Sequence, residues 1–125
     1  GETLSLKQFG VEEPKEHDDF LARYIEIVKA NISNPELDVS VIYEALGMSR
    51  TNFYRKVKTV TGLSPIELIK NIRLEAGAKL LKESDMNVSE IAQHIGFSSR
   101  SYFARSFKAV YGMSPTEYQE TESQN

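Results

Sequence analysis

The chain has 125 residues and a formal net charge of −3, from 15 Lys and Arg against 18 Asp and Glu. This length suits one compact domain or two very small ones, and the absence of Cys excludes a disulfide framework, a thiolate zinc site and a cysteine nucleophile. A negative net charge by itself argues against nucleic acid as a partner, because affinity for phosphate needs clustered Lys and Arg. No apolar run approaches the length of a membrane span, and no signal peptide is visible.

The first part of the chain is predicted to be a tether followed by one helix. Residues 1–17 are polar and rich in Glu, and because the chain starts at Gly1 without a Met, we expect it to be a fragment of a longer protein. Apolar residues then recur at helical spacing from Phe20 to Ile32. This pattern predicts a helix over residues 18–34, which ends before Pro35 because the residue before a proline disfavours helical backbone.

The most informative feature of the sequence is an internal repeat. The segments from Val39 to Pro65 and from Val88 to Pro115 share at least twelve identical residues over about 27 positions, with one extra residue in the second copy. Each copy predicts a short helix, a turn at Gly47 or Gly96, and a second helix, which is the helix-turn-helix pattern. Two copies are too few for a solenoid. The chain is therefore predicted to be all-α, with two tandem helix-turn-helix units.

Helix-start signals give the boundaries of the parts. Capping boxes at Ser64 with Glu67 and at Ser114 with Glu117 open the helix after each unit, and further N-caps are predicted at Ser40, Ser49, Ser89 and either Ser98 or Ser99. The predicted parts are a tether (1–17), a flanking helix (18–34), a first unit (36–64), a linker helix (65–84), a second unit (87–120) and a disordered tail (121–125). A linker helix of this length spans about 28 Å, against about 34 Å between successive major grooves on one face of B-DNA.

The second helix of each unit has an apolar and a polar face. The apolar faces, predicted to be buried, consist of Phe53, Val57 and Val60 and of Phe103, Phe107 and Val110. The opposite faces consist of Arg50, Thr51, Tyr54, Arg55 and Lys58 and of Arg100, Ser101, Ala104, Arg105 and Lys108. Arg can donate two hydrogen bonds to guanine, Thr or Ser can meet either kind of base, and Lys can hold a phosphate. One charged helix face is usually only solvated, but its repetition behind two tight turns favours two readers of the major groove.

The distribution of charge removes the objection raised by the net charge. Residues 1–38 carry 4 basic and 9 acidic side chains, whereas residues 50–82 carry 8 basic and 2 acidic ones. The basic stretch contains the first reader and the linker helix, with Lys70, Arg73, Lys79 and Lys82. We therefore expect a polarised molecule that is basic where the readers and the linker meet phosphate.

Residues from about 36 to 120 resemble the DNA-binding domain of AraC-type transcription regulators. The resemblance rests on Ser89-Glu90-Ile91-Ala92, Gly96-Phe97, Ser101-Tyr102-Phe103 and Gly112-Met113-Ser114-Pro115, and on Ile72-Arg73-Leu74-Glu75-Ala76 in the linker helix. It implies about seven helices and a double-stranded DNA operator read by Arg50, Thr51, Tyr54 and Arg55 and by Arg100, Ser101, Ala104 and Arg105. The expected phosphate contacts are Ser49, Lys58, Ser98 and Lys108. Because Ala104 offers only a methyl group, the second unit is expected to read fewer bases.

The flanking helix and the run from Met48 to Lys56 are most similar to the C-terminal output domain of hybrid two-component sensors. This resemblance implies a cytoplasmic bacterial regulator, with receiver and kinase domains upstream on the same polypeptide. It also implies that the full-length protein forms a homodimer, contacts RNA polymerase, and is anchored in the inner membrane where it carries a membrane-bound sensor region. No cofactor and no metal are expected.

An enzyme and a protein-interaction module are the alternative functions. The chain has only two His, His17 and His94, with no Cys and no Gly-rich phosphate loop, so no catalytic or metal-binding residue is expected. A helical interaction module without DNA binding, using the exposed ring of Tyr54, stays open as the alternative. Steep weakening of binding as salt rises would favour DNA, because each phosphate contact releases counterions.

Overall fold

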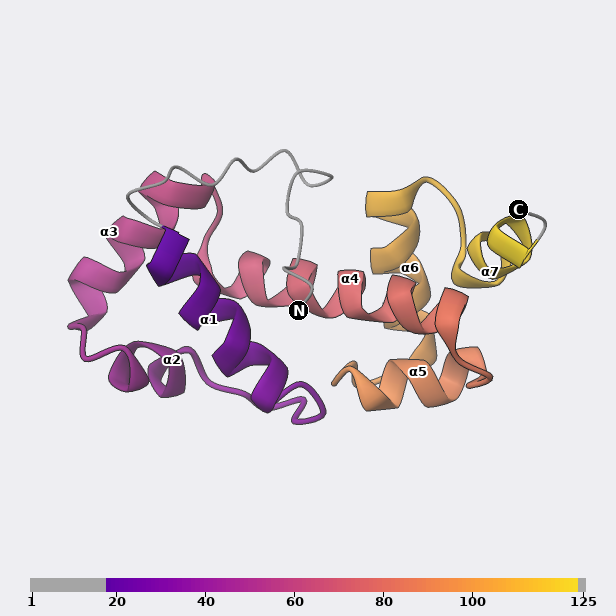
Figure 1. Ribbon diagram of the computed structural model, residues 1–125, viewed down its shortest axis with the longest axis horizontal. Helices are drawn as coiled ribbons and strands as arrows, with labels where there is room; N and C mark the ends of the chain where they lie inside the picture. The colour runs from indigo at the N-terminus through magenta and orange to yellow at the C-terminus, as the bar shows by residue number, and fades with distance from the viewer. Residues whose placement is uncertain (1–17, 124–125) are drawn as a thin grey trace. The chain divides into compact units, whose positions relative to one another are not determined.

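The computed structural model describes residues 18–123. The described chain is entirely helical, as the sequence predicts, and contains no strand between residues 18 and 123 (Figure 1). Its helices are α1 (Asp18–Ala30), α2 (Val39–Ala45), α3 (Arg50–Thr61), α4 (Pro65–Glu83), α5 (Val88–His94), α6 (Arg100–Tyr111) and α7 (Pro115–Ser123). The predicted tether, residues 1–17, lies outside the described residues. None of these helices is both long enough and apolar enough to cross a membrane.

The described residues form two compact units, each with its own core. Unit 1 consists of residues 18–31 and 37–72, and unit 2 of residues 32–36 and 73–123. The helix α4 runs without interruption across the boundary. Its first residues therefore complete the core of unit 1, and its last residues begin the core of unit 2.

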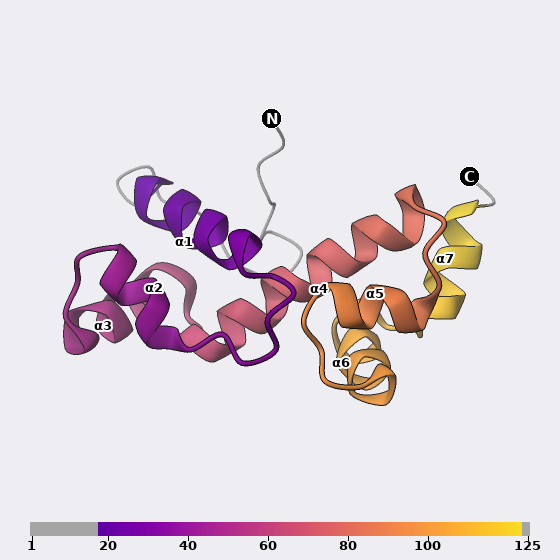
Figure 2. The ribbon, with the colours of Figure 1, turned by 90° about the horizontal axis from the view of Figure 1, so that it is seen from below.

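The core of unit 1 is built between α1, α2, α3 and the start of α4 (Figure 2). Tyr24 of α1 is fully buried, and its hydroxyl donates a hydrogen bond of 2.8 Å to the carbonyl oxygen of Pro65. Burial, with a smaller contribution from Tyr54, raises the pKa of the Tyr24 hydroxyl. The other buried side chains are Phe20, Leu21, Ile25, Val28, Val39, Ile42, Phe53, Val57, Val60, Leu68, Ile69 and Ile72.

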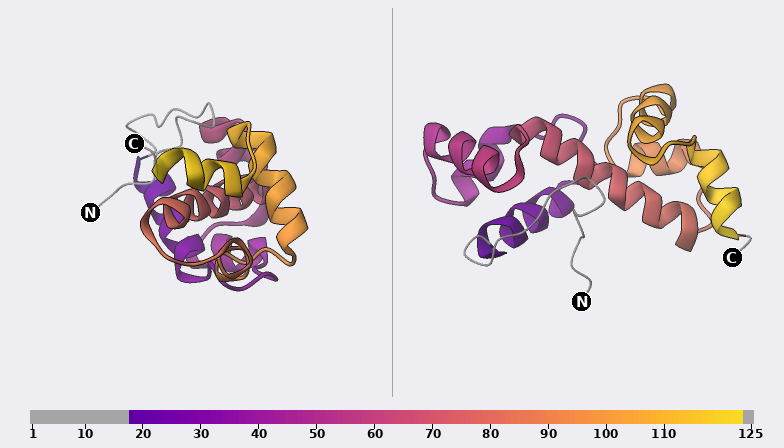
Figure 3. Two further views of the ribbon diagram at one scale, coloured as in Figure 1. Left: turned by 90° about the vertical axis from the view of Figure 1, so that its right-hand side faces the viewer. Right: turned by 90° about the horizontal axis from the view of Figure 1, so that it is seen from above.

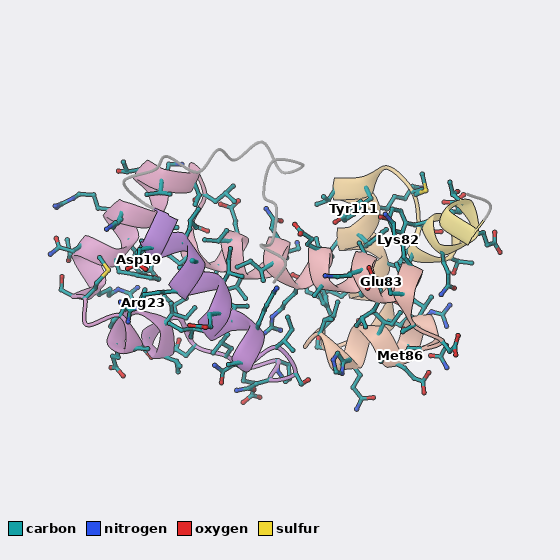
Figure 4. The ribbon with its side chains drawn as sticks, viewed as in Figure 1. Asp19, Arg23, Lys82, Glu83, Met86 and Tyr111 are labelled. Carbon is teal, nitrogen blue, oxygen red and sulfur yellow. The ribbon has the colours of Figure 1, made fainter. Side chains whose placement is uncertain are left out.

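The core of unit 2 is built between the second part of α4 and the helices α5, α6 and α7. The helix α5 runs beside α4 in Figures 1 and 2, and α7 lies beside the C-terminal part of α4 (Figure 3). Gln119 of α7 donates a hydrogen bond of 3.2 Å to the carbonyl oxygen of Leu81. The Lys82 ammonium, labelled in Figure 4, lies 5.2 Å from the centre of the Tyr118 ring. The buried apolar side chains are Leu74, Ala78, Leu81, Val88, Ile91, Ala92, Ile95, Phe97, Phe103 and Phe107.

Arg73 is a structural residue of unit 2. Its side chain is only 6% exposed, and its two terminal nitrogens donate hydrogen bonds to the carbonyl oxygens of Gly96 (2.6 Å) and Asn34 (2.7 Å). Gly96 has a φ of +86°, and a Cβ there would lie 2.2 Å from Arg73 Nη1 and 2.4 Å from the Ile32 carbonyl oxygen. Burial lowers the pKa of Arg73. The charge pattern of the sequence predicts a guanidinium on the phosphate-facing surface here, and the burial of Arg73 shows that prediction to be wrong.

Two predicted boundaries are also wrong. The helix predicted over residues 18–34 ends at Ala30, because the Asn31 side chain donates to the Ile27 carbonyl oxygen (2.8 Å) and the chain turns there. Ile32 packs in the core of unit 2 instead of extending the apolar face of α1. At the other end, residues 121–123 of the predicted disordered tail belong to α7, which continues from the capping box at Ser114. Residues 124–125 lie outside the described residues.

The predicted starts of α3, α4, α6 and α7 are confirmed. Ser49 and Ser99 cap α3 and α6, and both predicted capping boxes form, with bonds of 2.8–3.2 Å. The caps predicted at Ser40 and Ser89 are wrong. Asp38 and Asn87 take the N-cap positions two residues earlier, because α2 and α5 each start one residue before the predicted serine. Val110 was expected in the core but is 37% exposed.

Truncation of Phe103 should destabilise the fold of unit 2. Its ring is fully buried and contacts the rings of Phe97 and Phe107 with centroid distances of 5.4 and 5.7 Å. Phe103→Ala is expected to lower the free energy of unfolding by about 3–5 kcal/mol, measured by urea denaturation followed by circular dichroism. Val110→Ala, on the same helix but part-exposed, is the control and should cost far less. Equal effects of the two substitutions would contradict the burial of Phe103.

Replacement of Arg73 by lysine should also destabilise unit 2. One ammonium cannot reproduce the planar pair of donors that bonds the Gly96 and Asn34 carbonyl oxygens. Arg73→Lys is therefore expected to cost about 1–3 kcal/mol in the same urea experiment. Lys79→Met, which removes an exposed charge from the same helix, should change stability by about 0.5 kcal/mol or less. An unchanged midpoint for Arg73→Lys would show that the two hydrogen bonds do not stabilise the unit.

Candidate nucleic-acid interface

The polar face of α3 is the first candidate surface. Arg50, Thr51 and Arg55 are exposed and Tyr54 is half-buried, whereas Phe53 is fully buried. Ser49 is exposed and its hydroxyl accepts a hydrogen bond of 3.3 Å from the Asn52 N–H. With Phe53 buried, three of the predicted base-reading residues of this helix are exposed and Tyr54 is partly accessible.

The polar face of α6 repeats this arrangement in unit 2. Arg100, Ser101 and Arg105 are exposed, and Ala104 is half-buried, like Tyr54 at the equivalent position. Ser98 is exposed, but Ser99 accepts the capping hydrogen bond of 3.0 Å from the Tyr102 N–H. Both helices thus expose similar side chains at equivalent positions. The main difference is that α3 has the ring of Tyr54 where α6 has the methyl group of Ala104.

A cluster of aromatic rings holds α3 in place. The ring of Tyr24 on α1 stacks on the ring of Phe53 at a centroid distance of 5.6 Å and an interplanar angle of 6°. Phe20 and Tyr43 contact Phe53 at 6.3 and 5.7 Å, and Tyr54 contacts it edge-on at 6.0 Å. The extra helix α1 is therefore part of the support of the first candidate surface.

Charged side chains of unit 1 attach α1 to its neighbours. The guanidinium of Arg23, labelled in Figure 4, donates to the Ala45 carbonyl oxygen at 3.4 Å. The Lys56 ammonium lies 4.8 Å from the centre of the Phe20 ring. Arg23 of α1 and Lys56 of the basic stretch therefore make packing contacts within unit 1.

The two equivalent arginines are held differently, a difference that the predicted helix faces do not indicate. The Arg50 guanidinium lies over the ring of Tyr54, with its carbon 4.7 Å from the ring centre. Arg100 instead donates a hydrogen bond of 3.3 Å to the hydroxyl of Ser89 on α5. The sequence signal for this difference is the exchange of Tyr54 for Ala104 between the repeats, because only the first copy offers a ring four residues after the arginine.

Lys58 and Lys108 lie near the C-terminal ends of their helices. The Lys58 ammonium donates a hydrogen bond of 3.1 Å to the carbonyl oxygen of Gly62, whose φ of +75° ends α3. Hydrogen bonds from Ser64 lower the pKa of Glu67, and Lys58 contributes to the same shift. Both lysines are exposed, so each ammonium is accessible to a phosphate.

The described chain offers no group for metal binding. Between residues 18 and 123, no three His, Asp or Glu side chains lie close enough to hold an ion. His94 is exposed at the end of α5, and its carbonyl oxygen accepts a hydrogen bond of 2.7 Å from Ser33. His17 lies outside the described residues.

A family model described as a helix-turn-helix domain matches residues 42–121. The chain is 35% identical over 107 residues to a protein of Formosa agariphila named histidine kinase P4, a match that covers 86% of this chain and 8% of that protein. It also matches bacterial transcriptional regulators, of whose length it spans about a third. The chain is therefore similar to a small part of each of these relatives.

Two solved structures have the same fold. The C-terminal domain of AraT, a response regulator from Geobacillus stearothermophilus, has a TM-score of 0.69 and 31% identity, covering 79% of this chain and 82% of that one. The DNA-binding domain of the global transcriptional factor AdpA, solved in complex with a target DNA, has a TM-score of 0.73 and 27% identity, covering 83% and 93%. From the family match and these neighbours, the chain belongs to the AraC-type helix-turn-helix family of DNA-binding transcription regulators.

Proposed function

We propose that this regulator binds its operator by inserting α3 and α6 into adjacent major grooves. The observation that carries the proposal is the repeated exposed face, in which buried Phe53 and Phe103 turn equivalent polar residues outwards. The proposed base-reading residues are Arg50, Thr51, Tyr54, Arg55, Arg100, Ser101, Ala104 and Arg105. Ser49, Lys58, Ser98 and Lys108 are proposed to contact phosphates, which fix position without reading sequence.

We further propose that the chain is the output domain of a two-component regulator in the bacterial cytoplasm. Support comes from the relative named as a histidine kinase, of which the chain matches 8%, and from the response regulator whose C-terminal domain shares the fold. Receiver and kinase domains upstream, dimerisation of the full-length protein and contact with RNA polymerase belong to the same proposal.

Selection of bound sites from random double-stranded DNA at two salt concentrations tests the DNA part of the proposal. Two readers in adjacent grooves predict two short preferred sequences whose centres lie about 10–10.5 base pairs apart. Affinity should fall steeply between the two salt concentrations, because phosphate contacts release counterions. Selection of a single short sequence would refute the use of two grooves, and binding that is insensitive to salt would favour the protein-interaction alternative.

Loss of Arg55 or Arg105, two of the proposed base-reading residues, should relax the preference for particular base pairs. Arg55 and Arg105 are exposed at equivalent positions of α3 and α6. Arg55→Ala and Arg105→Ala are each expected to cost about 1–3 kcal/mol on the selected site and to relax the preference at one or two base pairs. Fluorescence anisotropy on the selected site and on single-base variants measures both effects. If both variants discriminate between these sites as the parent chain does, the two arginines are not readers.

Loss of a predicted phosphate contact should affect all sequences alike. Lys58→Ala and Lys108→Ala are expected to weaken selected and scrambled DNA to the same degree and to reduce the slope of log affinity against log salt by about one. The slope is measured by titration at several salt concentrations. The circular dichroism spectrum is the control for Lys58→Ala, because this residue also bonds the Gly62 carbonyl oxygen. Unchanged slopes would remove both lysines from the set of phosphate contacts.

A further inference from the structure

The helices α3 and α6, which are the proposed recognition helices, differ in how each holds its first arginine. Arg50 and Arg100 occupy the same position of the repeat, as the first residue of α3 and of α6. Arg50 lies over the Tyr54 ring, whereas Arg100 donates a hydrogen bond to Ser89. The difference follows from the residue four positions later, which is Tyr54 in one helix and Ala104 in the other.

A contact between a guanidinium and an aromatic face leaves its hydrogen-bond donors available. The cation is attracted by the ring as a whole, so this contact does not commit any of the five N–H groups to a hydrogen-bond acceptor. The Tyr54 ring is itself held in place, since it is half-buried and contacts the fully buried ring of Phe53 at 6.0 Å. Arg50 is therefore held by a ring that is itself fixed, while its N–H groups can still donate two hydrogen bonds to a guanine.

Arg100 has neither feature. Ala104 provides no ring, and one terminal nitrogen is already used in the 3.3 Å hydrogen bond to the Ser89 hydroxyl on α5. To donate two hydrogen bonds to a base, Arg100 has to leave this hydroxyl and order its long side chain on binding. Ordering a flexible side chain on binding reduces affinity. A side chain that is already held in place before binding does not incur this loss.

We propose that Tyr54 is a positioning residue that determines specificity by holding Arg50 for one guanine, and that the second reader discriminates less at the equivalent base pair. This inference rests on the proposed insertion of α3 and α6 into major grooves. At the base pair read by Arg50, it assigns Tyr54 an action through Arg50, distinct from the base contact proposed for Tyr54 above. It also makes the operator asymmetric, with a sharper preference in the half-site read by unit 1.

The test compares matched exchanges between the two helices. Affinities of the whole chain are measured by fluorescence anisotropy for the selected site and for single-base variants in each half-site. Tyr54→Ala is expected to reduce discrimination at the Arg50 base pair about three- to tenfold. Tyr54→Phe keeps the ring and should restore most of that discrimination. Ala104→Tyr gives the second helix a ring and should raise discrimination at the Arg100 base pair.

A double-mutant cycle separates positioning from direct contact. If Tyr54 acts through Arg50, Tyr54→Ala should add little to the loss caused by Arg50→Ala, because the ring has no guanidinium left to hold. Additive losses, or a Tyr54→Ala variant that discriminates like the parent chain, would overturn the inference. If Tyr54→Ala fails to fold, judged by circular dichroism, unchanged discrimination in Ala104→Tyr overturns it instead. Failure of Arg55→Ala and Arg105→Ala to change any preference would refute the proposed readers themselves, a distinguishable result.

Discussion

The burial of one phenylalanine in each recognition helix is the constraint on which both candidate surfaces depend. Phe53 and Phe103 are fully buried. Because an α-helix has 3.6 residues per turn, fixing the direction of one side chain fixes the direction of all the others. The arginine two positions after each phenylalanine, Arg55 or Arg105, is then turned away from the core. Arg50 and Arg100, three positions before, are exposed at the first position of their helices. The surface proposed to meet DNA is thus a consequence of apolar packing on the opposite side of the same helix.

The core that buries Phe53 extends beyond the segment matched by the family. The family match begins at residue 42, yet two of the four rings around Phe53, those of Phe20 and Tyr24, come from α1. The Tyr24 hydroxyl also bonds the Pro65 carbonyl oxygen at the start of α4. The flanking helix is therefore a structural part of unit 1, and Tyr54, which rests on Phe53, connects this core to Arg50.

The two copies of the repeat reach the same geometry with different supports. Gly47 and Gly96 both have positive φ at the turn, so both need glycine for the backbone. A Cβ at Gly47 would meet nothing within 4 Å, whereas at Gly96 it would collide with Arg73 and with the backbone of residue 32. Glycine is thus required for its backbone at the first turn, and for its lack of a side chain as well at the second.

Much of this protein is determined by the sequence alone, because the signals are local. Apolar spacing predicts the faces of α3 and α6, and the pairs Ser64 with Glu67 and Ser114 with Glu117 predict the starts of α4 and α7, since each cap joins residues three apart. The predicted helix over 18–34 was too long because the Asn31 side chain, and not Pro35, ends it. The residue that caps a helix depends on where the helix starts to within one or two residues, and apolar periodicity does not resolve a boundary that finely.

Only the tertiary structure decided where the long cationic side chains lie. In the sequence, Arg73 is one more basic residue of the linker helix, but in the fold it is buried and bonds carbonyl oxygens 23 and 39 residues away. Arg50 and Arg100 are identical in the repeat, yet one rests on Tyr54 and the other bonds Ser89. Charge and spacing locate the backbone of an arginine, whereas the partner of its guanidinium depends on which distant groups the fold brings within reach of a long, flexible side chain.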